Sequence, residues 1–282
     1  MITKYKSRSA DSSQHSSGQA GREKPKTTFK QTAPSQGRGR FRRAQTASGK
    51  SAPAAREQIY QKDKLKIMVM GGLEEVGRNM TIIEYNKEII IIDMGLQFPE
   101  EDMHGIDYII PNISYLEGKE DWIRGIIITH GHYDHIGAIP HLMGKIGNPP
   151  MFMGKMAAGI VQKRVAEFKQ CPKLNIATVD ESSKVSLGEA FRIEFLRVNH
   201  SIPDCFAIII NTPIGRIIHT GDFKIDYSPV NDKPADLNRI AQLGGQGVLM
   251  LMSDSTDSTH PGYQISESSI GDEMGKLFEK IK

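Results

Sequence analysis

Short apolar runs separated by turn residues begin near residue 64 and continue to the end of this 282-residue chain. Runs of four to eight residues that are rich in isoleucine and valine and bounded by glycine, proline or asparagine predict β-strands. The turns Gly71-Gly72, Asn86-Lys87 and Thr212–Gly215 separate several of these runs. The strands that we expect span residues 67–70, 80–85, 88–93, 125–129, 174–179, 191–198, 206–211, 216–220 and 248–253.

Apolar positions at helical spacing predict helices over 136–146, 155–169 and 237–243. Ser266 is expected to cap a final helix, because Glu267 and Asp272 then stand near its positive end. Early hairpins followed by alternating helices and strands predict an α/β fold with helices outside the sheets. The last helix reaches residue 282 with no loop after it, which we interpret as a chain cut in mid-fold.

Residues 1–62 have almost no large apolar side chains, so we expect a disordered extension. Residues 1–60 hold 13 of the 36 Lys and Arg residues but only 3 of the 33 Asp and Glu residues. A basic arm on an acidic body favours a polyanionic partner such as RNA, and a solubilising tail is the alternative. The arginines around Phe41 are typical of flexible RNA-binding segments: Arg38, Arg40, Arg42 and Arg43.

The cysteine content and the hydropathy of the chain indicate in which cellular compartment it is expected. Cys171 and Cys205 are the only cysteines, so no disulfide framework is implied and a reducing cytoplasm is the simple interpretation. No apolar run approaches the ~18 residues of a membrane span, and no apolar segment follows the early lysines as in a secretory signal. We therefore expect a cytoplasmic protein without a membrane partner.

The stretch His130-Gly131-His132-Tyr133-Asp134-His135 follows the apolar run 126–128 directly. Imidazole and carboxylate groups at the end of a buried strand are costly to bury, and a divalent metal satisfies them best. His130 and His132 point to the same side of an extended segment and can share one metal. Asp134 and His135 lie further on and can reach a second. The spacing therefore indicates a two-metal hydrolytic centre.

Three more polar residues stand at the ends of apolar strands: Asp93, His200 and Asp222. A single aspartate after a strand is usually a turn residue. Three such ends beside one histidine cluster favour a common site, because sheet-based enzymes gather functional groups at strand ends.

Several longer motifs resemble the ribonuclease J family, in the β-CASP branch of the metallo-β-lactamase-fold hydrolases. The motifs stand in the family's order over about 65–282, at 71–80, 98–111, 130–135, 198–204, 219–224 and 253–256. The resemblance implies an αββα sandwich, here incomplete. Its first part would occupy residues 63–250, and residues 251–282 would begin the β-CASP domain.

The resemblance also implies two zinc ions, with manganese as an alternative, held by the following ligands: His130, His132, Asp134, His135, His200 and Asp222. His130, His132 and His200 would hold the first ion. Asp134 and His135 would hold the second, and Asp222 would bridge the two. Asp134 and Asp222 would be the catalytic carboxylates, and Asp93 would orient a histidine ligand.

The activity implied by the resemblance is 5′-to-3′ exonuclease and endonuclease cleavage of single-stranded RNA in RNA maturation and decay, by a homodimer or homotetramer. Asp222, rather than Cys205, at the bridging position argues against a cysteine-ligand β-lactam hydrolase. The alternatives are another hydrolase of this fold, such as a tRNA 3′-processing endonuclease or a thioesterase, and a non-catalytic scaffold subunit in RNA decay.

Two features depart from the family pattern. Glu74 stands where a glycine is expected in the first turn, which we interpret as a tight hairpin. The resemblance implies a later histidine ligand beyond residue 282, so we expect the chain by itself to be inactive. Gly105 and Asp107 match a peripheral calcium-binding loop of the family without its third ligand.

The other histidines, His104, His141 and His219 among them, are expected to have structural or surface roles.

Overall fold

The computed structural model describes residues 64–230 and 232–281. The first sheet, in the order β1-β2-β3-β4-β5-β6, is antiparallel through β3 and parallel from β3 onward. The second has the order β11-β10-β9-β8-β7 and is antiparallel except for the β10–β11 pair. The strands are β1 (Lys66–Gly71), β2 (Met80–Tyr85), β3 (Glu88–Ile92), β4 (Ile123–Ile127), β5 (Met151–Met153), β6 (Ile176–Thr178), β7 (Lys184–Leu187), β8 (Phe191–Arg197), β9 (Phe206–Asn211), β10 (Arg216–His219) and β11 (Met250–Met252).

Helices follow the strands much as the pattern predicts, with one exception. The described helices are α2 (Tyr133–Ile136), α3 (Ile139–Leu142), α4 (Lys155–Val165), α5 (Leu237–Gly245) and α6 (Glu267–Lys280), with 3-10 turns η1 (Ser114–Leu116), η2 (Glu120–Trp122) and η3 (Met143–Lys145). The single helix predicted over 136–146 is wrong, because α2, α3 and η3 divide this segment. Pro140 lacks an N–H and fits only the first turn of α3, so it cannot continue α2.

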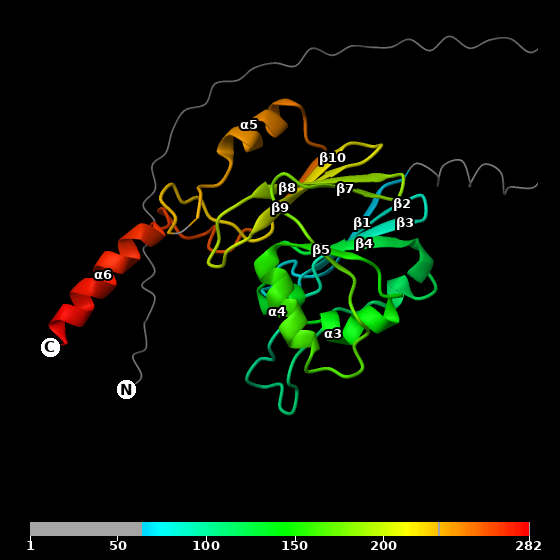
Figure 1. Cartoon of the computed structure of the whole chain (residues 1–282), viewed down its shortest axis with the longest axis horizontal. Coiled ribbons are helices and arrows are strands. Elements are labelled where there is room, and N and C mark those ends of the chain that lie inside the picture. Colours follow the sequence, from blue (N-terminus) through cyan, green and yellow to red (C-terminus); the bar gives the residue numbers. More distant parts are fainter. Residues whose placement is uncertain (1–63, 231, 282) are drawn as a thin grey trace, which may run out of the picture. The chain divides into compact units, whose positions relative to one another are not determined.

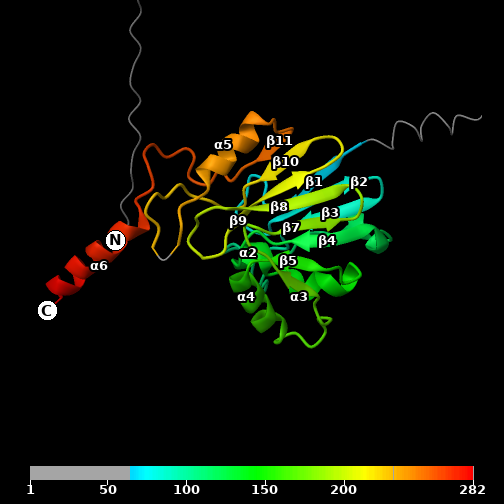
Figure 2. The same ribbon diagram turned by 45° about the horizontal axis from the view of Figure 1, so that its top comes forward.

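Three apolar cores show that the sheets form a sandwich with helices on both outer faces (Figures 1 and 2). The central core joins β2, β3 and β4 of the first sheet to β8, β9 and β10 of the second, with residues such as Ile90, Phe195 and Ile208. A second core packs α3 and α4 on the first sheet, and a third packs Leu243 of α5 on the second. The order α/β/β/α agrees with the predicted sandwich.

The first residue of α6 is anchored to the loop after β10. Asp226 accepts hydrogen bonds from the Ser266 hydroxyl at 2.7 Å, the Glu267 N–H at 3.0 Å and the Ser228 N–H at 2.9 Å. Ser266 also caps the helix as predicted, accepting from the Ser268 N–H. These donors, the Glu267 N–H foremost, lower the pKa of Asp226 to about 2.

Because of this low pKa, the contribution of Asp226 to stability depends on pH and is lost in acid. The folded pKa of Asp226 is about 2, below the ordinary value of about 3.9. Its contribution to stability is therefore complete above pH ~4 and is lost as the pH falls toward 2. Thermal unfolding between pH 2 and 6 should show an Asp226→Asn deficit that shrinks on acidification. Asp272→Asn in α6 is the control, and a deficit independent of pH would contradict the charge effect.

Candidate metal centre

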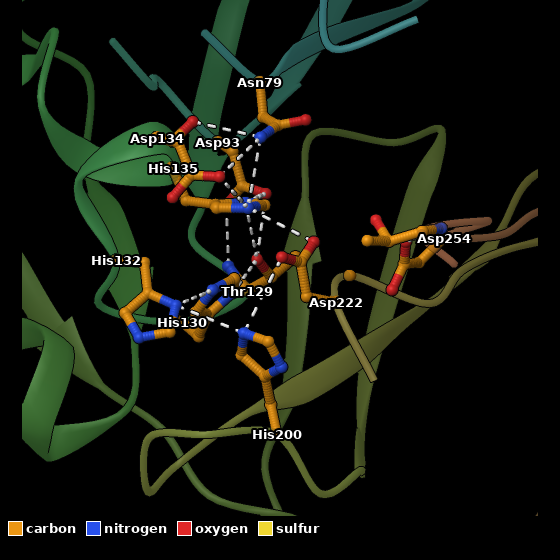
Figure 3. A network of polar contacts seen from close by, with 12 residues as sticks. Asn79, Asp93, Thr129, His130, His132, Asp134, His135, His200, Asp222 and Asp254 are labelled. Carbon is orange, nitrogen blue, oxygen red and sulfur yellow. Dashed lines mark hydrogen bonds and ion pairs between the residues drawn. The ribbon is translucent and has the colours of Figure 1, made fainter. Parts of the chain in front are cut away.

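The site lies where loops from both sheets meet (Figure 3). Asp93 directly follows β3, and the 130–135 stretch runs from the end of β4 into α2. His200 follows β8 and Asp222 follows β10, both in the second sheet. The strand-end residues that the sequence analysis singled out are therefore brought together in one place.

Three imidazole nitrogens converge at one end of this centre. His130 Nε2 lies 3.0 Å from His132 Nδ1, and His200 Nε2 lies 3.2 Å from the same atom. The donor atoms of all three lie within 4.8 Å of one another. Two nitrogens bound at tetrahedral angles to one zinc ion at ~2.0–2.1 Å are roughly 3.3 Å apart. The spacing of the three nitrogens therefore fits a single metal ion.

A second group of donors lies beside the first. His130, His135 and Asp222 also offer atoms within 4.8 Å of one another. His135 Nε2 is 3.3 Å from Asp222 Oδ1 and 3.4 Å from Asp134 Oδ2. The other Asp222 oxygen, Oδ2, is 3.7 Å from His200 Nε2. The two oxygens of Asp222 thus face different groups, so this carboxylate could be shared between two ions.

Asp93 binds the Nδ1 side of the His135 ring. Its Oδ2 lies 2.8 Å from His135 Nδ1 and accepts from the Thr129 hydroxyl at 2.9 Å, while Oδ1 accepts from the Thr129 N–H at 2.8 Å. Asp93 is buried and has a φ of 60°, a left-handed conformation that aspartate tolerates better than most residues other than glycine. With Nδ1 bound to Asp93, His135 presents Nε2 to the centre.

Burial and neighbouring charges set the protonation of the imidazoles in opposite directions. Burial, followed by the nearby His135, lowers the pKa of His130 to about 2, so its nitrogen keeps a free lone pair. Burial would also lower the pKa of His135, but Asp93, Asp134 and Asp222 outweigh it and raise the pKa well above its ordinary value. The centre thus combines a neutral buried imidazole, His130, with carboxylates that favour positive charge on His135. A divalent cation satisfies such a set of donors.

The loop that carries the histidines is bound to two other segments by its backbone. Asn79 N–H donates to Asp134 O at 2.9 Å, and Met94 N–H donates to His135 O at 2.7 Å. Gly95 N–H donates to Asn79 O at 2.9 Å. A Cβ on Gly95 would lie 1.5 Å from Asp134 O. Only a glycine permits this approach, so the position of the loop depends on Gly95.

Sequence reasoning missed functional roles for Asn79 and Thr129. The Asn79 amide nitrogen lies 3.3 Å from Asp134 Oδ2 and 3.2 Å from His135 Nε2, and Thr129 links Asp93 to the loop. Asn79 closes the first glycine-rich motif, and that position was the available signal. Asp254 lies beside Asp222 (Figure 3), and its N–H donates to the Thr220 hydroxyl at 3.0 Å. It belongs to a motif to which no role was assigned.

The turn before Asn79 contains the position at which this chain departs from the family pattern. Glu74, where the pattern has glycine, has a φ of 58°. This left-handed conformation is the one that glycine adopts without strain.

The remaining predicted residues among those described belong to neither donor group. Gly105 and Asp107 are exposed, and within 64–230 and 232–281 no group of three donor side chains includes Asp107, so the calcium loop stays a prediction. His219 accepts from the Gly221 N–H at 3.1 Å, and His104 is exposed. The basic positions of the arm lie outside the described residues: Arg38, Arg40, Arg42 and Arg43.

Comparison with known proteins agrees with this geometry. The family model described as "Metallo-beta-lactamase superfamily" matches residues 73–259, and the chain belongs to that superfamily. A solved structure of a protein of unknown function from Enterococcus faecalis has a TM-score of 0.53 at 16% identity, covering 72% of this chain and 52% of that one. This likeness supports the fold alone.

Within the superfamily, the chain is similar to curated proteins named ribonuclease J. It is 38% identical to the protein from Synechocystis over 79% of this chain, and 41% identical to ribonuclease J 1 from Streptococcus pyogenes over 78% and to the Helicobacter pylori protein over 82%. The matched regions cover 35%, 39% and 33% of those relatives. The resemblance to the N-terminal portion of ribonuclease J is confirmed, and the chain spans little more than a third of these relatives' length.

Proposed function

We propose that this chain carries the metal-binding half of a ribonuclease that hydrolyses single-stranded RNA. The observation that carries the proposal is the convergence of His130, His132, His200 and Asp222 from strand ends of two sheets. The similarity to ribonuclease J supports RNA as the substrate class.

The residues of the centre have distinct roles in this proposal. The first ion would be held by His130, His132 and His200, and the second by Asp134 and His135, with Asp222 shared. Two divalent ions bound there supply an activated water at neutral pH and neutralise charge on the phosphate.

Two residues behind the ligands fix the geometry. Asp93 keeps His135 in the tautomer and orientation that present Nε2. The Asn79 amide restrains the carboxylate of Asp134, 3.3 Å away.

We propose zinc as the metal, because a mixture of imidazole and carboxylate donors suits it, with manganese as the alternative.

The proposal also covers the type of cleavage, the compartment and the assembly. We propose both 5′-to-3′ exonuclease and endonuclease cleavage, in the cytoplasm, by a homodimer or homotetramer. Within 64–230 and 232–281, no helix is long and apolar enough to cross a membrane. Residues 1–282 alone are expected to be inactive, because the resemblance implies a further histidine ligand of the second ion that is not among them.

The alternatives differ in what they require of the site. A non-catalytic scaffold subunit would not need the donors, so the clustering of His130, His132, His200 and Asp222 supports a catalytic role instead. A tRNA 3′-processing endonuclease or a thioesterase of the same fold would use the same donors, so substrate analysis separates them.

The test is metal content and product analysis with the full-length protein. About two equivalents of zinc or manganese per subunit are expected, together with metal-dependent release of mononucleotides or internal fragments from a 5′-monophosphorylated RNA. Cleavage that persists after chelator has removed all metal would overturn the proposal, and so would a metal-loaded protein that cleaves no RNA.

A further inference from the structure

Tyr133 has an unusual place in the ligand loop. It stands between His132 and Asp134, but its side chain points outward and the residue is 41% exposed. Its backbone is fixed, because its carbonyl accepts hydrogen bonds from the Leu96 N–H at 3.1 Å and the Gly137 N–H at 2.7 Å. An aromatic ring is therefore presented to solvent, on a rigid backbone, next to the metal centre.

Arg164 of α4 lies between this ring and a second one. Its guanidinium carbon is 5.5 Å from the centre of the Tyr133 ring and 4.7 Å from the centre of the Phe168 ring. One terminal nitrogen is bound to Glu167 at 2.7 Å. The Arg164 Nε is buried and has no hydrogen-bond partner among the described residues. The guanidinium plane is thus held in place by ring contacts and one carboxylate.

The row of planar groups continues away from the centre. His141 packs edge-on against Phe168 at 4.9 Å and lies 4.7 Å from the Tyr108 ring. Burial and the positive charges of Arg164 and Lys145 lower the pKa of His141. Arg164 and Lys145 thus place positive charge along this row, as a polyanion-binding surface requires.

We propose that Tyr133 and Arg164 form a base-stacking site, which positions one nucleotide of single-stranded RNA beside the phosphodiester at the metal centre. This inference rests on the proposed function. Each base has a π-face that can stack on tyrosine or on a guanidinium plane, whatever its identity. Bases within a duplex are already stacked and cannot enter such a site. The site therefore favours unpaired RNA without selecting a sequence.

The experiment compares variants of the full-length protein on a set of substrates. One is a single-stranded RNA oligonucleotide, and the others carry one abasic nucleotide at successive positions. Tyr133→Ala should raise the KM for intact RNA about 10-fold or more and leave kcat within about 2-fold, because stacking binds substrate and transition state alike. Tyr133→Phe, which keeps the ring, should stay within about 2-fold of wild type.

Abasic substrates make the test specific. For one abasic position, the wild type should show the same raised KM as Tyr133→Ala does on intact RNA, and the two losses should not add. Arg164→Ala should raise the KM in the same way. Lys163→Ala removes a charge from the adjacent position of α4 and should leave KM unchanged. Metal content and circular dichroism verify that each variant is folded.

The outcomes separate the two proposals. A wild type that cleaves RNA, with Tyr133→Ala and Arg164→Ala at unchanged KM, overturns the stacking site and leaves the ribonuclease proposal intact. An equal rise in KM for Lys163→Ala and Arg164→Ala would show that the effect comes from positive charge in general. That result also overturns the stacking site. A metal-loaded wild type without RNA cleavage overturns the ribonuclease proposal and the stacking site together.

Discussion

Replacing Asp222 by asparagine is expected to reduce RNA hydrolysis by about 1,000-fold or more in the full-length protein. The two oxygens of Asp222 lie 3.3 Å from His135 Nε2 and 3.7 Å from His200 Nε2, so both groups of donors depend on this carboxylate. Asparagine keeps the shape but removes the negative charge. Metal catalysis contributes several kcal/mol, and each 1.36 kcal/mol corresponds to about a factor of ten in rate.

Rates on a single-stranded RNA and metal content by mass spectrometry check this expectation. Asp257→Asn is a matched control, because Asp257 also faces a histidine, His260 at 3.2 Å, but on the exposed surface. It should have wild-type activity. An Asp222→Asn variant with activity near that of the wild type would remove Asp222 from the catalytic site.

Gly95→Ala should disrupt the centre without altering any metal ligand. The added Cβ would meet Asp134 O at 1.5 Å and Asn79 N at 2.7 Å, and both are backbone atoms that cannot rotate away. The ligand loop must therefore move. We expect a loss of about 3 kcal/mol of folding stability, at the upper end for overpacking, and loss of the second metal equivalent. Thermal unfolding and metal content measure the two effects.

Gly159→Ala is the matched control for this change. Gly159 lies in α4, and a Cβ there meets nothing within 4 Å. Alanine is favoured over glycine in a helix interior by roughly 0.5–1 kcal/mol, so this variant should be slightly more stable than the wild type. If Gly95→Ala behaved in the same way, the close approach would not hold the loop.

The sequence predicted long strands better than short ones. The runs at 80–85 and 206–211 match β2 and β9 residue for residue, because both are rich in isoleucine and turns bound them. The three residues of β5 and the four of β7 were missed. Pairing with neighbours decides such short strands, and a local pattern cannot show it.

The residues of the functional site could likewise be predicted only in part. The clustering of the histidines with Asp222 could be predicted, because metal chemistry demands particular side chains and strand ends bring them together. Asn79 and Thr129 could not, since amides and hydroxyls are common in loops and acquire a role only through contacts made in the folded chain. The contact between Tyr133 and Arg164 joins residues 31 positions apart, on different helices, and no local pattern indicates it.

The donors of the centre come from both sheets of the sandwich. His130 to His135 follow a strand of the first sheet, and His200 and Asp222 follow strands of the second. An ion bound there acts as a cross-link between the halves of the core. Ligand present at 100 times its dissociation constant stabilises the native state by about 2.7 kcal/mol. Loss of the metal would thus weaken the architecture as well as the chemistry.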